Sequence, residues 1–229
     1  MFLRNVIDAS VEDVSAFKPN LAHYLAMGTD GIQLLTDIIE HIDHRAIVIL
    51  DGKFGDVSDS MEHYARAAFD VFDADAVTVD VYGGWDTVEP MLVDPTRGVF
   101  VWARSSNPDA DAVQGGSRDA APLFVRLAAE IQSRAAMGNL GAVVGATRAD
   151  DARRMRAAAP SVPLLAPGVG AQGGDLDAVV RAGFGDAPAG VLINAGRSAL
   201  WASADADYAL AARAAVQEMR DRINAVRSA

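Results

Sequence analysis

Short apolar runs rich in β-branched residues alternate along the chain with longer stretches in which apolar residues recur every three or four positions. The short runs are apolar on both faces, as is typical of strands in a parallel sheet covered by helices. The longer stretches have the period of amphipathic helices. We expect strands at residues 16–20, 46–53, 75–82, 98–105, 141–147, 162–168 and 190–196.

Helices are expected after most of these strands, and no linker, repeat or low-complexity segment interrupts the alternation. Seven strands are one short of a (β/α)8 TIM barrel, and a chain of 229 residues is long enough for one such domain. The sequence therefore predicts an α/β protein with a single barrel domain over residues 1–229, apparently lacking the first β-strand. A doubly wound sheet is the alternative. The expected helices lie at residues 30–42, 58–72, 122–137, 149–159, 175–183 and 205–223.

The glycine pattern G-x-G-x-x-G within residues 166–175 decides between these two folds. In a dinucleotide-binding domain this turn follows the first strand, and the next strand ends in an acidic residue. Here it follows the sixth expected strand, and Arg197 stands where the acid is needed. The loops after the last strands of a barrel commonly bind phosphate, so we expect Gln172, Gly196 and Arg197 to do so. Alternatively, the glycines only form tight turns and Arg197 pairs with a surface aspartate.

The net charge of −11 argues against a surface for nucleic acid or anionic membranes. The chain has no cysteine, which excludes disulfides, thiolate catalysis and cysteine-bound zinc. No apolar run is long enough for a membrane span, and the start of the chain is too acidic for a signal peptide. These features predict a soluble cytoplasmic protein. The acidic, lysine-poor composition suits either a salt-rich cytoplasm or a GC-rich genome.

The two lysines of the chain, Lys18 and Lys53, lie beside aspartates in the expected barrel. An ammonium can pass a proton to a substrate, whereas a guanidinium is not suited to that task. Asp51 and Lys53 are two positions apart at a strand end, so their side chains leave on one face, and Asp56 follows in the loop. Lys18 ends the preceding strand and is expected beside Asp51. A solvated salt bridge is the alternative; a calcium loop is excluded because the lysine occupies a ligand position.

Six motifs in order, FKPN, LDGKFGD, TVDVYGG, SSNPDA, PGVGAQGGD and NAGRS, resemble the orotidine 5′-monophosphate decarboxylase family. The resemblance runs from about Phe2 to the end of the chain. It implies a (β/α)8 barrel, usually a homodimer, that converts orotidine monophosphate to uridine monophosphate and CO₂ without a metal or a cofactor. The substrate would thus be a small molecule rather than a nucleic acid.

The resemblance also implies roles for individual residues. Lys53 would protonate the ring carbon that loses CO₂, Asp51 would face the departing carboxylate, and Asp56 would reach into the partner's site. Ser106 matches a serine that contacts the pyrimidine, and Ser60 stands near the ribose where threonine is usual. The charged network implied by the motifs is Lys18, Asp51, Lys53 and Asp56, and the phosphate site is Gln172, Arg197 and the amide of Gly196.

Two departures from the family pattern leave alternatives open. The family begins with a strand that carries an aspartate for the ribose, and nothing before Phe2 supplies it, so either the chain is a piece of a longer protein or the barrel opens at that position. Gly52 and Phe54 replace the commoner alanine and arginine. Other candidate functions are a Mg²⁺-dependent sugar-phosphate lyase or synthase of the same barrel group, and a catalytically silent binder of nucleotide phosphates.

Overall fold

The computed structural model describes residues 1–117, 120–134, 136, 138–169, 173–184 and 190–228. The chain divides into two compact units, Met1–Val99 with Gly196–Asp221, and Phe100–Ala195 with Arg222–Ala229. All seven expected strands are present among the described residues, and no strand precedes the first helix there. None of the described helices is both long enough and apolar enough to cross a bilayer.

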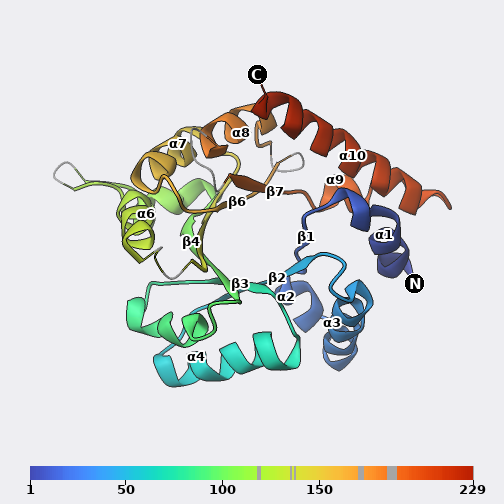
Figure 1. Ribbon diagram of the computed structural model, residues 1–229, viewed down its shortest axis with the longest axis horizontal. Coiled ribbons are helices and arrows are strands. Elements are labelled where there is room, and N and C mark those ends of the chain that lie inside the picture. The colour runs from blue at the N-terminus through green and yellow to red at the C-terminus, as the bar shows by residue number, and fades with distance from the viewer. Residues whose placement is uncertain (118–119, 135, 137, 170–172, 185–189, 229) are drawn as a thin grey trace. The chain divides into compact units, whose positions relative to one another are not determined.

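The first unit contains three parallel strands whose hydrogen-bonded order follows the chain (Figure 1). Leu50 and Val77 of these strands and Leu35 and Ile42 of a covering helix are fully buried, which explains the apolar runs at residues 48–50 and 76–77 within the strands. The strands are β1 (Ala16–Phe17), β2 (Ile47–Phe54) and β3 (Ala76–Val79), and the helices are α1 (Phe2–Ser10), α2 (Leu21–Leu25), α3 (Thr29–Ile42) and α4 (Ser58–Ala65).

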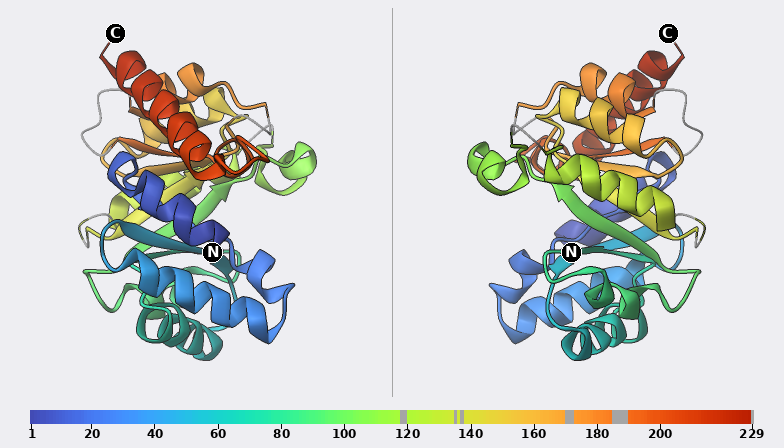
Figure 2. Two further views of the ribbon diagram at one scale, coloured as in Figure 1. Left: turned by 90° about the vertical axis from the view of Figure 1, so that its right-hand side faces the viewer. Right: turned by 90° about the vertical axis from the view of Figure 1, so that its left-hand side faces the viewer.

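The end of the chain returns to the first unit as α9 (Arg197–Leu200) and the start of α10 (Tyr208–Arg227). Figure 2 shows α10 beside α1. Phe2 stacks on Trp201 with ring centroids 6.0 Å apart and contacts Tyr208 at 4.9 Å. Asp13 accepts hydrogen bonds from two arginines of α10, Arg213 and Arg220. Aromatic packing and these ion pairs therefore attach α10 to the start of the chain.

The second unit contains most of β4 (Gly98–Arg104), with β5 (Leu140–Val144), β6 (Leu164–Pro167) and β7 (Val191–Asn194) following in order. The pairs β5–β6 and β6–β7 are parallel. Helices alternate with the strands, and Figure 1 shows α6, α7 and α8 in succession along them. The helices of this unit are α5 (Asp111–Gln114), α6 (Leu123–Arg134), α7 (Ala149–Ala158) and α8 (Leu176–Phe184).

The sequence misjudged several boundaries for local reasons. The strand expected at 16–20 ends at Phe17, because Pro19 has no amide to donate to a ladder, and only the isolated bridge from Asn20 to Asp51 continues it. The helix expected at 58–72 is α4 followed by a π-helical turn, Arg66–Val71. The short helices α2, α5 and α9 and the 3-10 turns Trp85–Thr87 and Glu89–Leu92 were not predicted.

Candidate active site

A β-bulge in β2 sets the position of the two charged residues at its end. The register of β2 against β3 shifts between Leu50 and Phe54, and Lys53 has a φ of 46°. A bulge re-aims side chains, and a non-glycine residue in the left-handed region costs about 1–3 kcal/mol. The Lys53 amide donates a hydrogen bond to Thr78 Oγ1 on β3 at 2.9 Å, which holds the unusual backbone in place. Backbone strain in this strand is thus located at the lysine.

Gly52 and Phe54, the two departures from the family motif, depend on each other. An ideal Cβ on Gly52 would lie 2.4 Å from the Phe54 ring, so the ring occupies the space that an alanine side chain needs. Phe54 is buried and packs against Tyr64 of α4 with centroids 4.9 Å apart. The glycine therefore allows an aromatic residue to cover the bulge.

The structure brings Lys18, Asp51 and Lys53 together in one ionic cluster. Lys18 Nζ donates to Asp51 Oδ2, and Lys53 Nζ donates to Asp51 Oδ1 at 2.5 Å. Thr78 Oγ1 also donates to Asp51 Oδ1, at 2.9 Å. The Asp51 side chain is only 7% exposed, whereas that of Lys53 is 33% exposed. Both sequence predictions for this cluster are confirmed: Asp51 and Lys53 share a face, and Lys18 lies beside Asp51.

The cluster carries two cations on one buried carboxylate. Burial raises the pKa of Asp51, but the charge of Lys18 and the hydrogen bonds from both lysines outweigh it, so the pKa lies below its usual value. Burial lowers the pKa of Lys18, and Asp51 offsets only part of that effect. With all three groups ionised, the cluster has one net positive charge.

Asp56 and Ser60 lie beyond the end of β2. Asp56 is exposed, and its Oδ1 accepts a hydrogen bond from the Val57 amide at 2.7 Å. Ser60 is half-buried in the first turn of α4. The reach of Asp56 into a second copy and the contact of Ser60 with a ribose stay predictions.

The expected phosphate-binding residues are described in part. Arg197 is exposed at the first residue of α9, and Gly196 caps that helix with no atom within 4 Å of an ideal Cβ. Gln172 lies outside the described residues. Gly168 and Gly173 have φ values of 107° and 77°, so both need glycine for the turn itself.

Ser106 belongs to the second unit, follows β4 and is itself half-buried. Thr78 is the residue that sequence reasoning missed, although it contacts both Asp51 and the Lys53 amide. It is the one hydroxyl in the buried run Ala76–Val79, and a buried hydroxyl needs a partner. A hydroxyl within an otherwise apolar strand was therefore the feature of the sequence that could have identified Thr78.

A sequence profile described as "Orotidine 5'-phosphate decarboxylase / HUMPS family" matches residues 2–212. The chain belongs to this family. It is 43% identical over 230 residues to a protein of Thermomicrobium roseum named orotidine 5'-phosphate decarboxylase, covering 99% of this chain and 82% of that protein. The resemblance inferred from the motifs is therefore confirmed at the level of the family.

Solved structures agree with this assignment. The fold is similar to Leishmania donovani OMP decarboxylase, with a TM-score of 0.88, 33% identity, and coverage of 99% of this chain and 86% of that one. It is also similar to Leishmania donovani UMP synthase, with a TM-score of 0.90 and 34% identity; this chain is 99% covered and spans 50% of that protein. The fold class is the (β/α)8 barrel, as the sequence predicted, and the described residues supply seven strands.

Proposed function

We propose that the chain converts orotidine 5′-monophosphate to uridine 5′-monophosphate and CO₂, without a cofactor, as a step of pyrimidine biosynthesis. The observation that carries the proposal is the cluster in which Lys18 and Lys53 both bind the carboxylate of Asp51. Relatives named orotidine 5'-phosphate decarboxylase support the same reaction, because they are up to 43% identical over nearly the whole chain.

The cluster supplies charge where the reaction needs it. In the proposed step the bond from the ring carbon to the carboxylate breaks, CO₂ leaves, and the electron pair stays on the carbon. Lys53 then gives its proton to that carbon; its ammonium is held 2.5 Å from Asp51 Oδ1, and its side chain is 33% exposed. Asp51 faces the carboxylate that leaves, and Lys18 keeps Asp51 ionised. Groups fixed before the reaction stabilise the transition state most effectively.

Residues remote from the reacting carbon provide binding energy. We assign the phosphate to Arg197, Gln172 and the Gly196 amide, the ribose to Ser60 and the pyrimidine to Ser106. The exposed position of Arg197 at the start of α9 is compatible with binding an anion. Binding energy from the phosphate can be used to hold the carboxylate of the substrate against Asp51.

We further propose that both units act as one barrel domain, and that the protein is a cytoplasmic homodimer in which Asp56 completes the partner's site. The exposure of Asp56 beside Val57, which is 65% exposed, supports this arrangement. Mixing inactive Lys53→Ala and Asp56→Ala proteins tests it. Restored activity in the mixture supports a shared site, and a mixture as inactive as its components contradicts it.

A Mg²⁺-dependent sugar-phosphate lyase or synthase remains the second candidate, since the family description also covers the HUMPS branch. Both oxygens of Asp51 already accept hydrogen bonds from ammonium groups, which disfavours metal binding at this carboxylate. Among the described residues no group of three acidic or histidine side chains is arranged to hold a metal.

The test is the loss of orotidine monophosphate absorbance, measured at low and at molar salt and with and without EDTA. Turnover that is insensitive to EDTA is expected. Turnover that requires Mg²⁺ would favour the second candidate. A folded chain that binds uridine monophosphate without turnover would instead be a silent nucleotide binder.

A further inference from the structure

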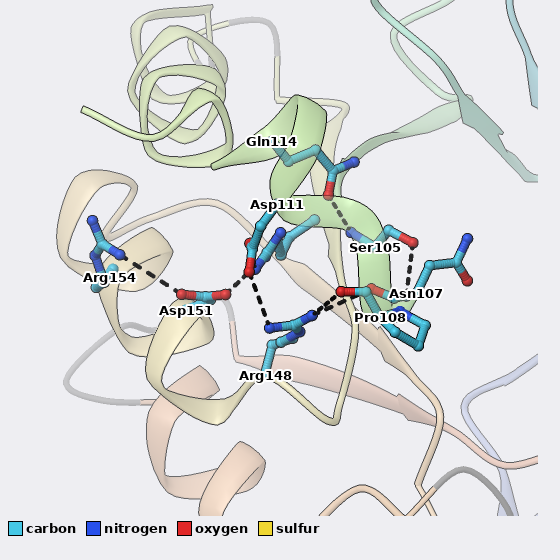
Figure 3. A network of polar contacts seen from close by, with 9 residues as sticks. Ser105, Asn107, Pro108, Asp111, Gln114, Arg148, Asp151 and Arg154 are labelled. Carbon is cyan, nitrogen blue, oxygen red and sulfur yellow. Dashed lines mark hydrogen bonds and ion pairs between the residues drawn. The ribbon is translucent and has the colours of Figure 1, made fainter. Parts of the chain in front are cut away.

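The loop Ser105–Ala110, here called the Ser106 loop, is fixed by polar contacts along its length (Figure 3). The Ser105 amide donates to Gln114 Oε1 at 2.8 Å, and the Asn107 amide donates to Ser105 Oγ at 3.1 Å. Arg148 donates to the carbonyl of Asn107 at 3.2 Å and to that of Pro108 at 3.4 Å. Both neighbours of Ser106 therefore have backbone groups bound by side chains.

Two arginines share one carboxylate behind this loop. Arg104 Nη2 donates to Asp111 Oδ1 at 2.5 Å, and Arg148 Nη1 lies 3.7 Å from Asp111 Oδ2. The Arg104 side chain is only 2% exposed; it also donates to Asp151 Oδ2 at 2.7 Å and lies over the Phe124 ring. Arg104 ends β4, directly before the loop, and Asp111 begins α5, directly after it. The bridge therefore fixes both ends of the loop.

Gly145, directly after the end of β5, supports Ser106. An ideal Cβ on Gly145 would lie 2.7 Å from the Ser106 amide nitrogen and 2.8 Å from its Cα, so the serine backbone rests directly on the glycine. The φ of Gly145 is not in the left-handed region. An alanine at position 145 would therefore not strain its own backbone. Its methyl group would instead displace the backbone of Ser106.

We propose that Arg104, Asp111 and Arg148 are positioning residues of the substrate site, which act by fixing the hydroxyl of Ser106 against the pyrimidine. The inference rests on the proposed function, in which Ser106 contacts the ring. A single hydroxyl contributes to substrate binding only when its position is accurate to a fraction of an ångström. A loop needs supporting contacts to hold a side chain that accurately. The planar fork of arginine suits this task, because it can bind a carboxylate and backbone carbonyls at once.

The test separates positioning from plain stabilisation by a double-mutant cycle. Asp111→Asn and Gly145→Ala are each made in the wild type and in the Ser106→Ala background, and kcat/KM for orotidine monophosphate is measured together with thermal unfolding. Asp150→Asn is the control, because Asp150 forms an exposed ion pair with Arg153 on α7 at 2.6 Å. Gly141→Ala is a control for Gly145→Ala, since its Cβ would meet the Phe100 ring rather than Ser106.

We expect Asp111→Asn and Gly145→Ala to lower kcat/KM by about 10-fold in the wild type, and by less than about 2-fold once Ser106 is alanine. Asp150→Asn should change kcat/KM by less than about 2-fold in both backgrounds. Equal losses with and without the Ser106 hydroxyl would overturn the positioning role, as would full activity of Gly145→Ala. A folded wild type without turnover would instead overturn the proposed function and this inference with it.

Discussion

The ionic clusters of the two units differ in the kind of cation and in its exposure. In the first unit two ammonium groups share the single carboxylate of Asp51, and Lys53 remains a third exposed. In the second unit Arg104 binds two carboxylates, those of Asp111 and Asp151, and its side chain is 2% exposed. A partly exposed ammonium can contact a ligand, whereas a buried guanidinium bound to two carboxylates holds elements together. The two lysines thus lie in the cluster to which we assign the chemistry, and Arg104 lies where two elements of the fold are held together.

Arg156 is a second structural arginine. It is buried and donates to the carbonyls of Gly183 at 2.7 Å, Val162 at 2.7 Å and Gly190 at 2.8 Å. Lys53, by contrast, is the one non-glycine residue with positive φ inside a described strand. The strained residue, Lys53, is the one assigned to the proposed chemistry. Arg156, whose donors bind backbone carbonyls, stabilises the fold.

The largest expected effect is that of Lys53→Ala on activity. Removing the proposed proton donor should lower kcat/KM for orotidine monophosphate by about 1000-fold or more, because general-acid and electrostatic contributions are lost together. Thermal unfolding should change little, since the Lys53 side chain is partly exposed. A variant that kept more than about a tenth of wild-type kcat/KM would contradict the role of Lys53.

Asp51→Asn should affect stability as well as activity. Removing a buried carboxylate leaves Lys18, whose side chain is 9% exposed, without its counter-charge, and such losses cost about 3–5 kcal/mol. Urea unfolding measures the change. Asp59→Asn, at an exposed position of α4, is the matched control and should change the free energy of unfolding by less than about 0.5 kcal/mol. Equal stability of the two variants would show that the cluster is not a buried ion pair.

Arg197→Ala tests whether a residue assigned to phosphate binding affects kcat/KM less than Lys53, which is assigned to the chemical step. Loss of a charge-assisted hydrogen bond to phosphate costs about 1.5–3 kcal/mol, so kcat/KM should fall by about 10- to 150-fold while turnover stays measurable. Steady-state kinetics beside those of Lys53→Ala provide the comparison. Losses of the same size in the two variants would contradict this division of labour.

The pH dependence of stability is the smallest expected effect. The pKa of Asp51 is lower in the folded chain than the unfolded value of about 3.9, so its contribution is fully present above that pH and is lost as the pH falls through the folded pKa. The difference in free energy of unfolding between wild type and Asp51→Asn should therefore be flat from about pH 5 to 7 and shrink below about pH 4. Urea titrations at several pH values measure it. A difference that grows on acidification would contradict a depressed pKa.

The sequence predicted the elements that follow from periodicity, and the part of the site that follows from strand geometry. Spacing alone placed Asp51 and Lys53 on one face, and chain order placed Lys18 beside them. The bulge and the positive φ of Lys53 could not be predicted, because they depend on the Thr78 hydroxyl across the strand pair. The Arg104 bridge was missed for the same reason: Asp151 is 47 positions away in the chain.

The measurement that tests the role of Lys53 most directly is kcat for Lys53→Arg. Arginine keeps the positive charge beside Asp51 but does not give up its proton, because the pKa of a guanidinium lies far above neutral pH. With Lys53 as the proton donor, kcat should fall by about 1000-fold or more while thermal unfolding stays close to that of the wild type. A Lys53→Arg protein with kcat within about 10-fold of the wild type would show that charge alone suffices, and would contradict lysine as the proton donor.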